Sequence, residues 1–304
     1  MASEYPSGRH RNGGFKLGRQ TVIGIPYLWS LLFFLLPFSM VVLISFSETI
    51  LAVPPYRWLV EWEDAYLTIS LNLQNYFLLW EDSTYLRAYL GSLKIAAIST
   101  LLALAIGFPL AYAMSRAPKH WRASLLMLII LPFWTSFLIR VYAWIGILKQ
   151  EGLLNLLLLN LGIIDEPLLI HGSEIAVYIG IVYSYLPFMV LPLYATLEKL
   201  DMSLLEAAYD LGCRPIKAFW LVVVPQAVPG IIAGCALVFI PAVGEFVVPD
   251  LLGGSDTLMI GKVLWSEFFT NLDWPLASAV AVILLILLVG PVVWFQRHQA
   301  KQLS

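Results

Sequence analysis

Six long runs of apolar residues, separated by shorter polar connections, dominate the chain. They cover residues 23–46, 89–114, 123–148, 175–197, 228–248 and 275–295. Each run is close to the length of about 20 residues that a helix needs to cross the hydrocarbon core of a membrane. Backbone polar groups in lipid must be paired within a segment, and the period-2 alternation of a β-barrel is absent from these runs, so they predict six transmembrane helices.

A seventh apolar stretch, residues 153–161, has nine residues and is too short to span. It predicts a helix that lies at the membrane surface or re-enters the membrane. The first long run lacks a small-residue cleavage site after it, so we expect an uncleaved first span rather than a signal peptide.

The amino-acid composition narrows the class of protein further. Hydrophobic residues make up 60% of the 304 residues and charged residues 12%, and the mean hydropathy is +0.82. A soluble domain usually carries about 25% charged residues. These values exclude an ordinary cytosolic enzyme and a disordered chain, and a net charge of −2 gives no basic bias toward nucleic acid. The chain is therefore expected to be an all-α integral membrane protein in contact with lipid.

Cysteine and histidine give no sign of catalytic or metal chemistry. The two cysteines provide no disulfide framework, and the four histidines are scattered outside the predicted spans. No span holds a His–Glu–His set or a Ser–His arrangement, which disfavours an intramembrane enzyme. We expect no catalytic residue, no metal and no cofactor.

The distribution of Lys and Arg predicts which side of the membrane each connection faces. The N-terminal segment, the second and fourth connections and the C-terminal tail hold twelve of the eighteen basic residues, whereas the first, third and fifth connections hold four. Both termini are therefore expected to be cytoplasmic, which agrees with an even number of spans. The chain then divides into a cytoplasmic segment 1–22, a transmembrane domain 23–296 and a cytoplasmic tail 297–304.

Acidic residues have the opposite distribution. The three connections expected outside carry fourteen Asp or Glu residues against the four basic ones. A negative outer face of this kind would concentrate cations and steer them inward. A solvated loop surface is the alternative interpretation.

The fourth connection, about residues 201–225, is the most informative part of the chain. The pattern predicts a short helix, a turn at Gly212 and a second helix whose first turn accepts Pro215. Four apolar residues share one face of the first helix at helical spacing: Leu204, Leu205, Ala208 and Leu211.

This connection resembles the EAA loop of ABC-transporter permease subunits. Glu206, Ala207, Ala208, Gly212 and Pro225 fill that pattern at the matching spacing. The resemblance implies a type I ABC importer permease fold in which the loop forms coupling helices that dock on a cytoplasmic ATPase. An interfacial amphipathic helix is the alternative interpretation. A phosphate-binding loop is missing, because residues 254–263 have six residues between the glycines where that motif has four and end in Val. ATP hydrolysis is therefore assigned to a separate subunit.

Four further stretches resemble the permeases of bacterial polyamine importers, and putrescine-transport permeases in particular. They are residues 131–148, 176–197, 241–254 and 259–281. The resemblance implies a subunit of the bacterial inner membrane that passes polyamine from periplasm to cytoplasm by alternating access. It also implies the partners: a second permease forming a heterodimer, two ATPase copies and a periplasmic polyamine-binding protein.

Charged residues inside spans are costly and are the first candidates for a substrate pathway. Arg140 lies in the third span, and Glu245 lies about one turn inside the outer end of the fifth; their depths differ by about 5 Å. Glu245 could receive a substrate ammonium. Alternatively, it could form a structural ion pair with Arg140.

Aromatic rings and loop carboxylates complete the set of pathway candidates. Trp134 and Tyr183 are chosen because the face of an aromatic ring attracts an ammonium, with packing as the alternative role. Asp250 and Asp273 flank the fifth connection and could meet an incoming cation, or could simply face solvent.

Two alternative functions stay open at this point. An ABC permease for another small solute would share the same spans and the same loop. An ATP-independent secondary carrier is less consistent with the sequence, because such folds often contain two repeated halves and no convincing internal repeat is present.

Overall fold

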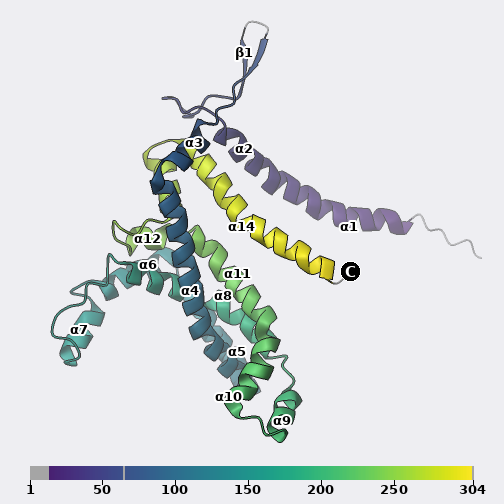
Figure 1. The fold of residues 1–304 in the computed structure, drawn as a ribbon, viewed down its shortest axis with the longest axis vertical. Helices are drawn as coiled ribbons and strands as arrows, with labels where there is room; N and C mark the ends of the chain where they lie inside the picture. The colour runs from purple at the N-terminus through teal and green to yellow at the C-terminus, as the bar shows by residue number, and fades with distance from the viewer. Residues whose placement is uncertain (1–13, 64–65, 303–304) are drawn as a thin grey trace, which may run out of the picture. The chain divides into compact units, whose positions relative to one another are not determined.

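The structure is a computed structural model that describes residues 14–63 and 66–302 (Figure 1). The chain forms two compact units, residues 1–76 with 273–283 and residues 77–272 with 284–304. From the N-terminus the elements are α1 (Gly14–Ser30), the π-helical turn η1 (Leu31–Leu35), α2 (Leu36–Ser45), the strands β1 (Val60–Glu63) and β2 (Tyr66–Ile69), α3 (Gln74–Glu81), α4 (Ser83–Arg116), α5 (Lys119–Ile130), the 3-10 turn η2 (Leu131–Trp134), α6 (Phe137–Leu148) and α7 (Leu153–Asn160). They continue with α8 (Glu174–Leu197), α9 (Met202–Asp210), α10 (Pro215–Ala218), the π-helical turn η3 (Phe219–Val223), α11 (Val224–Val243), α12 (Val247–Leu251), α13 (Ile260–Trp265), the π-helical turn η4 (Ser266–Thr270) and α14 (Trp274–Gln302).

The helices confirm the helical membrane fold, with five candidate spans among the described residues, or six if a bent pair of helices counts as one. Five are long and apolar enough to cross a membrane: Thr21–Ser45, Ser83–Arg116, Glu174–Leu197, Pro215–Val243 and Trp274–Val293. The bent pair is Lys119–Trp134 with Phe137–Asn160, whose two halves meet at 90°, and it forms either a broken span or a re-entrant loop.

The bend changes the predicted third span, which was drawn as one run over residues 123–148. The helix breaks at Thr135 and Ser136, just after Pro132, whose ring nitrogen cannot donate a helical hydrogen bond. Thr135 closes the break, because its hydroxyl donates to the carbonyl oxygen of Pro132 at 2.7 Å. The short apolar stretch does form its own helix, α7.

The fifth span also differs from the prediction of residues 228–248. The helical run starts at Pro215 in the fourth connection and ends at Val243, and Gly244 caps it. Glu245 therefore follows the end of the span instead of lying one turn inside it. Pro241 and Gly244 weaken the last turn and account for the earlier end.

The centre of the second unit is a mutual packing of α4, α8 and α11, which lie side by side in Figure 1. Glycines bring the three backbones close together around Met189 of α8. A Cβ at Gly107 of α4 would lie 2.9 Å from Met189 Cγ, and one at Gly234 of α11 would lie 2.8 Å from Met189 Sδ. Small residues at helix contacts are the usual packing device inside membranes.

The first unit contains the first span and the β1–β2 hairpin, in which Val60 pairs with Ile69 and Glu63 with Tyr66. Asn75 is buried and donates to the carbonyl oxygens of Ser45 and Ser47 at 2.9 and 3.0 Å. These bonds fix the end of α2. In the predicted cytoplasmic segment 1–22, residues 1–13 lie outside the described residues and the remainder belongs to α1.

Candidate functional site

The loop between α8 and α11 has the helix–turn–helix form that the sequence predicts. The Asp201 carboxylate accepts from the Ser203 amide at 3.0 Å and caps the start of α9. Gly212 has a φ of +76°, a conformation that side-chain-bearing residues rarely adopt. Its amide donates to the Tyr209 carbonyl at 2.8 Å, and the Cys213 amide donates to the Ala208 carbonyl at 2.9 Å. Gly212 thus reverses the chain at the end of α9.

Only part of the predicted apolar face of α9 is buried. Leu205 is 2% exposed and packs into the core beside Leu197 and Ala218, and Ala208 is half-buried. Leu211 and Ile216 instead are 88% and 77% exposed. Leu205 therefore anchors the loop in the core. The side chains of Leu211 and Ile216 at the turn are solvent-exposed, as are Glu206 and Ala207.

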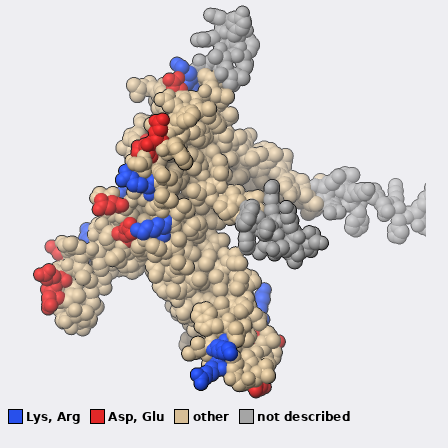
Figure 2. All heavy atoms as spheres, viewed as in Figure 1, with Lys and Arg blue, Asp and Glu red and all other residues tan. Residues whose placement is uncertain are grey.

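Charged groups of the second unit collect at its ends. Figure 2 shows Lys and Arg side chains together with some acidic ones at the α9–α10 end, acidic side chains near α7, and a mostly uncharged surface along the helices between them. Among the described residues, no group of three or more His, Cys, Asp or Glu is placed to hold a metal ion.

Glu245 is a buried carboxylate whose two oxygens are both occupied. It is 7% exposed. Oε1 accepts from the amides of Val247 and Val248 at 3.0 and 3.4 Å, and Oε2 accepts from the Tyr185 hydroxyl. The carboxylate therefore caps the first amides of α12 and ties that helix to α8. The part played by Tyr185 could not be read from the sequence, where it was one of many aromatic residues.

Arg140 does not pair with Glu245, which is the structural alternative that the sequence suggested. Its guanidinium carbon lies 4.9 Å from the ring centre of Phe133 and 5.6 Å from that of Phe137. Its Nε and Nη1 atoms are buried and have no hydrogen-bond partner in the described part of the chain. The bend of the third span explains the difference, because it aims Arg140 at aromatic rings on either side of the break.

The two aromatic candidates have different surroundings. Trp134 ends η2 at the break in the third span, and its side chain is 72% exposed. Tyr183 is 36% exposed and meets Trp144 edge-on, with ring centres 5.4 Å apart. Both rings therefore keep free surface, and no contact in the described part of the chain joins either of them to Glu245.

The two loop aspartates both have partners. Asp250 of α12 lies 3.4 Å from the Lys262 ammonium of α13. Asp273 belongs to the first unit, where it accepts from the Thr49 hydroxyl at 2.7 Å and from the Leu276 amide at 3.0 Å. Asp273 therefore caps α14, a role that its place directly before Trp274 and Pro275 could have indicated.

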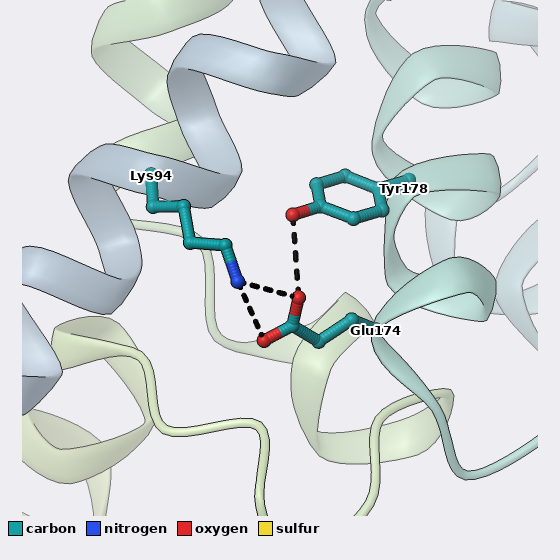
Figure 3. Close-up of polar contacts among 3 residues, drawn as sticks. All are labelled: Lys94, Glu174 and Tyr178. Carbon is teal, nitrogen blue, oxygen red and sulfur yellow. Dashed lines mark hydrogen bonds and ion pairs between the residues drawn. The ribbon is translucent and has the colours of Figure 1, made fainter.

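A polar cluster that the sequence did not single out as a site links α4 and α8 (Figure 3). The Lys94 ammonium donates to both carboxylate oxygens of Glu174 at 2.9 and 3.2 Å, and the Tyr178 hydroxyl donates to one of them at 3.4 Å. Lys94 lies near the outer end of the second predicted span, where a lysine side chain can extend toward the membrane surface. Its pairing with a residue 80 positions away has no signal in a single sequence.

Comparison with known protein families identifies the family to which this helical architecture belongs. The profile of the family described as binding-protein-dependent transport system inner membrane component matches residues 19–304. The chain belongs to this family. It is therefore a multi-pass permease subunit of the inner membrane, and it is a transport component rather than an enzyme, as the sequence predicts.

Relatives of the permease carry more specific names. It is 40% identical over 270 residues to the spermidine/putrescine transport system permease protein PotB of Haemophilus influenzae, covering 89% of this chain and 90% of that one. It is 41% identical over 268 residues to PotB of Escherichia coli, covering 88% and 91%. The inner membrane ABC transporter permease protein YdcU of Escherichia coli is 33% identical and covers 73% and 74%.

Solved structures support the fold of the permease. A bacterial ABC transporter involved in the import of alginate matches with a TM-score of 0.68 at 14% identity, covering 95% of this chain and 98% of that one. The MetNI methionine ABC transporter in an inward-facing conformation matches with a TM-score of 0.53 at 17% identity, covering 71% and 94%. The predicted type I importer permease fold is thereby confirmed.

Proposed function

We propose that this permease passes polyamines, and putrescine in particular, from the periplasm to the cytoplasm in an ATP-driven importer. The observation that carries the proposal is the pair of relatives named as spermidine/putrescine permeases, which are 40–41% identical over almost the full length of both chains. The acidic connections expected on the outer face agree with a cationic cargo.

The proposed assembly contains a second permease, two copies of a cytoplasmic ATPase and a periplasmic polyamine-binding protein, with both termini of this chain in the cytoplasm. Residues 1–22 and 297–304 then flank the transmembrane domain. Glu206, Ala207, Ala208 and Gly212 lie in the surface that docks on the ATPase, and Pro225 lies near the start of the span that follows. The exposure of Leu211 and Ile216 supports this role, because bare apolar side chains at a charged, water-facing loop fit a protein interface.

In this mechanism the chain moves a cation and makes or breaks no covalent bond. ATP binding closes the two ATPase copies, and residues 206–225 pass the motion to the spans, which rock between outward-open and inward-open arrangements. Trp134 and Tyr183 offer ring faces to the ammonium groups. Arg140 and Glu245 support the shape of the pathway, while Asp250 and Asp273 belong to its outer connections.

Uptake of radiolabelled putrescine and spermidine tests the proposal. Cells that lack this chain and every other polyamine importer are complemented with wild-type protein or with an empty vector. Uptake restored by the wild type alone, and reduced by excess unlabelled polyamine, supports the function. Unchanged uptake on deletion would instead leave a permease for another small solute. Uptake that persists without any ATPase subunit would favour a secondary carrier.

A further inference from the structure

The cluster of Lys94, Glu174 and Tyr178 holds an alkylammonium on a carboxylate. The Lys94 ammonium contacts both oxygens of Glu174, and the Tyr178 hydroxyl contacts one of them from the next turn of α8 (Figure 3). A lysine side chain is a four-carbon stem that ends in an ammonium group. Putrescine has the same four-carbon stem with an ammonium group at each end, so either end of it resembles the lysine side chain.

The pair is open to its surroundings. The Lys94 side chain is 56% exposed and that of Glu174 is 43% exposed. An exposed carboxylate facing hydrocarbon would be costly, so the open side of the pair must face water or lipid headgroups. Glu174 is the first residue of α8, at the end that the charge pattern assigns to the outer face.

We propose that Glu174 and Tyr178 form a transient site for a polyamine ammonium, and that Lys94 is a tethered occupant which the substrate displaces. The inference rests on the proposed function. Exchange of one alkylammonium for another keeps the Glu174 carboxylate paired, and the displaced Lys94 ammonium, already 56% exposed, is left to its solvent-facing side. The contacts of an exposed ion pair are weak enough to be exchanged.

Lys94 also explains why the site would release its cargo. A displaced Lys94 ammonium stays nearby and repels the bound cation. A transport site has to bind well enough for entry and weakly enough for departure. The tethered lysine thus sets the affinity of Glu174 for the passing substrate.

Equilibrium binding of radiolabelled putrescine to the purified complete transporter in nanodiscs, without the binding protein, tests the proposal. Lys94→Met keeps the stem and removes the competitor, so it should lower the dissociation constant about three- to tenfold. Glu174→Gln keeps the shape and removes the carboxylate charge, so it should raise the constant by at least a similar factor. Tyr178→Phe should have a smaller effect in the same direction as Glu174→Gln.

The opposite signs make the test decisive. A purely structural ion pair is broken equally by Lys94→Met and Glu174→Gln, so the two variants would then shift binding in the same direction or leave it unchanged. Either result overturns the inference, as does a Lys94→Met transporter that binds no putrescine. Arg122→Met and Glu198→Gln break a matched pair of 3.2 Å between α5 and the end of α8 and should leave binding unchanged. Failure of wild-type cells to import polyamine would instead reject the proposed function itself.

Discussion

At the scale of single residues, Glu245 illustrates how a buried charge can serve structure. Two amides of α12 and the Tyr185 hydroxyl fill three of the roughly four acceptor sites on its two oxygens, so little capacity is left for an incoming ammonium in the arrangement described. A charge placed in this position is stabilised by the donors around it. Removal of the carboxylate leaves those donors without an acceptor, and each buried donor left unsatisfied lowers the stability of the fold by about 1–3 kcal/mol.

Substitutions of Glu245 separate the capping role from a role in substrate capture. Glu245→Gln keeps an acceptor for the α12 amides and offers an N–H to the Tyr185 oxygen, so we expect a stability loss below about 1 kcal/mol and import within about threefold of wild type. Glu245→Leu should destabilise the permease by about 3 kcal/mol. Thermal denaturation of the purified complex and uptake in cells measure the two effects. A stable Glu245→Gln permease that imports nothing would show that the charge itself serves transport.

At the scale of helices and loops, the sequence predicts the spans better than their breaks. Hydrophobic runs locate the five unbroken spans and the bent pair, because burial in lipid selects apolar residues over a fixed length. The break at Thr135 and Ser136 lies inside one continuous apolar run, residues 123–148, so the length of that run gives no sign of it. The form of the α9–α10 loop follows from its motif and the glycine turn. The contact of Glu245 with Tyr185 and the pair of Lys94 with Glu174 join distant parts of the chain, which one sequence does not encode visibly. The contacts of Arg140 are local, but they depend on the bend.

Asn155 shows how a polar side chain fixes the bent third span. It is 1% exposed, and its amide group donates to the carbonyl oxygens of Lys149, Gln150 and Leu168 at 3.3, 3.1 and 3.0 Å. Its oxygen accepts from the Leu168 amide at 2.9 Å. These bonds close the turn between α6 and α7 and attach it to the segment that leads to α8.

Replacement of Asn155 should release this segment without unfolding the helix bundle. Asn155→Leu removes every bond, and Asn155→Asp removes the donors and places charge beside three carbonyl oxygens. A loss of about 2 kcal/mol in local stability corresponds to hydrogen exchange about 30-fold faster over residues 150–170. Asn160→Leu, at the exposed end of α7, is the matched control and should leave exchange unchanged. Equal protection in all the variants would contradict the assignment of Asn155 as the clamp.

At the scale of the whole molecule, one helical run joins the proposed coupling loop to the Glu245 cap. Pro215–Val243 has 29 residues, and at about 1.5 Å per residue it spans about 44 Å. Its first turns belong to the loop, where Ala218 is fully buried, and its last turn leads into Gly244 and Glu245. A displacement of the loop is therefore applied directly to the span, without passing through a flexible linker. The π-helical turn over Phe219–Val223 is the one irregular segment within that run, and such turns are frequent at functional sites.

Gly212 offers a test of this coupling because its requirement is conformational. A Cβ at this position would meet nothing within 4 Å, so substitution affects the φ of +76° and not the packing within this chain. Asn tolerates this backbone conformation, whereas a β-branched residue is strongly disfavoured there. Gly212→Asn should therefore import polyamine at a rate close to wild type. Gly212→Val should reshape the turn and lower import at least tenfold, while the isolated ATPase keeps its hydrolysis rate.

Comparison of uptake, copurification of the ATPase and ATP hydrolysis between the two variants separates lost coupling from lost expression. Normal import by Gly212→Val would mean that the left-handed turn is dispensable and that the motion enters the permease elsewhere.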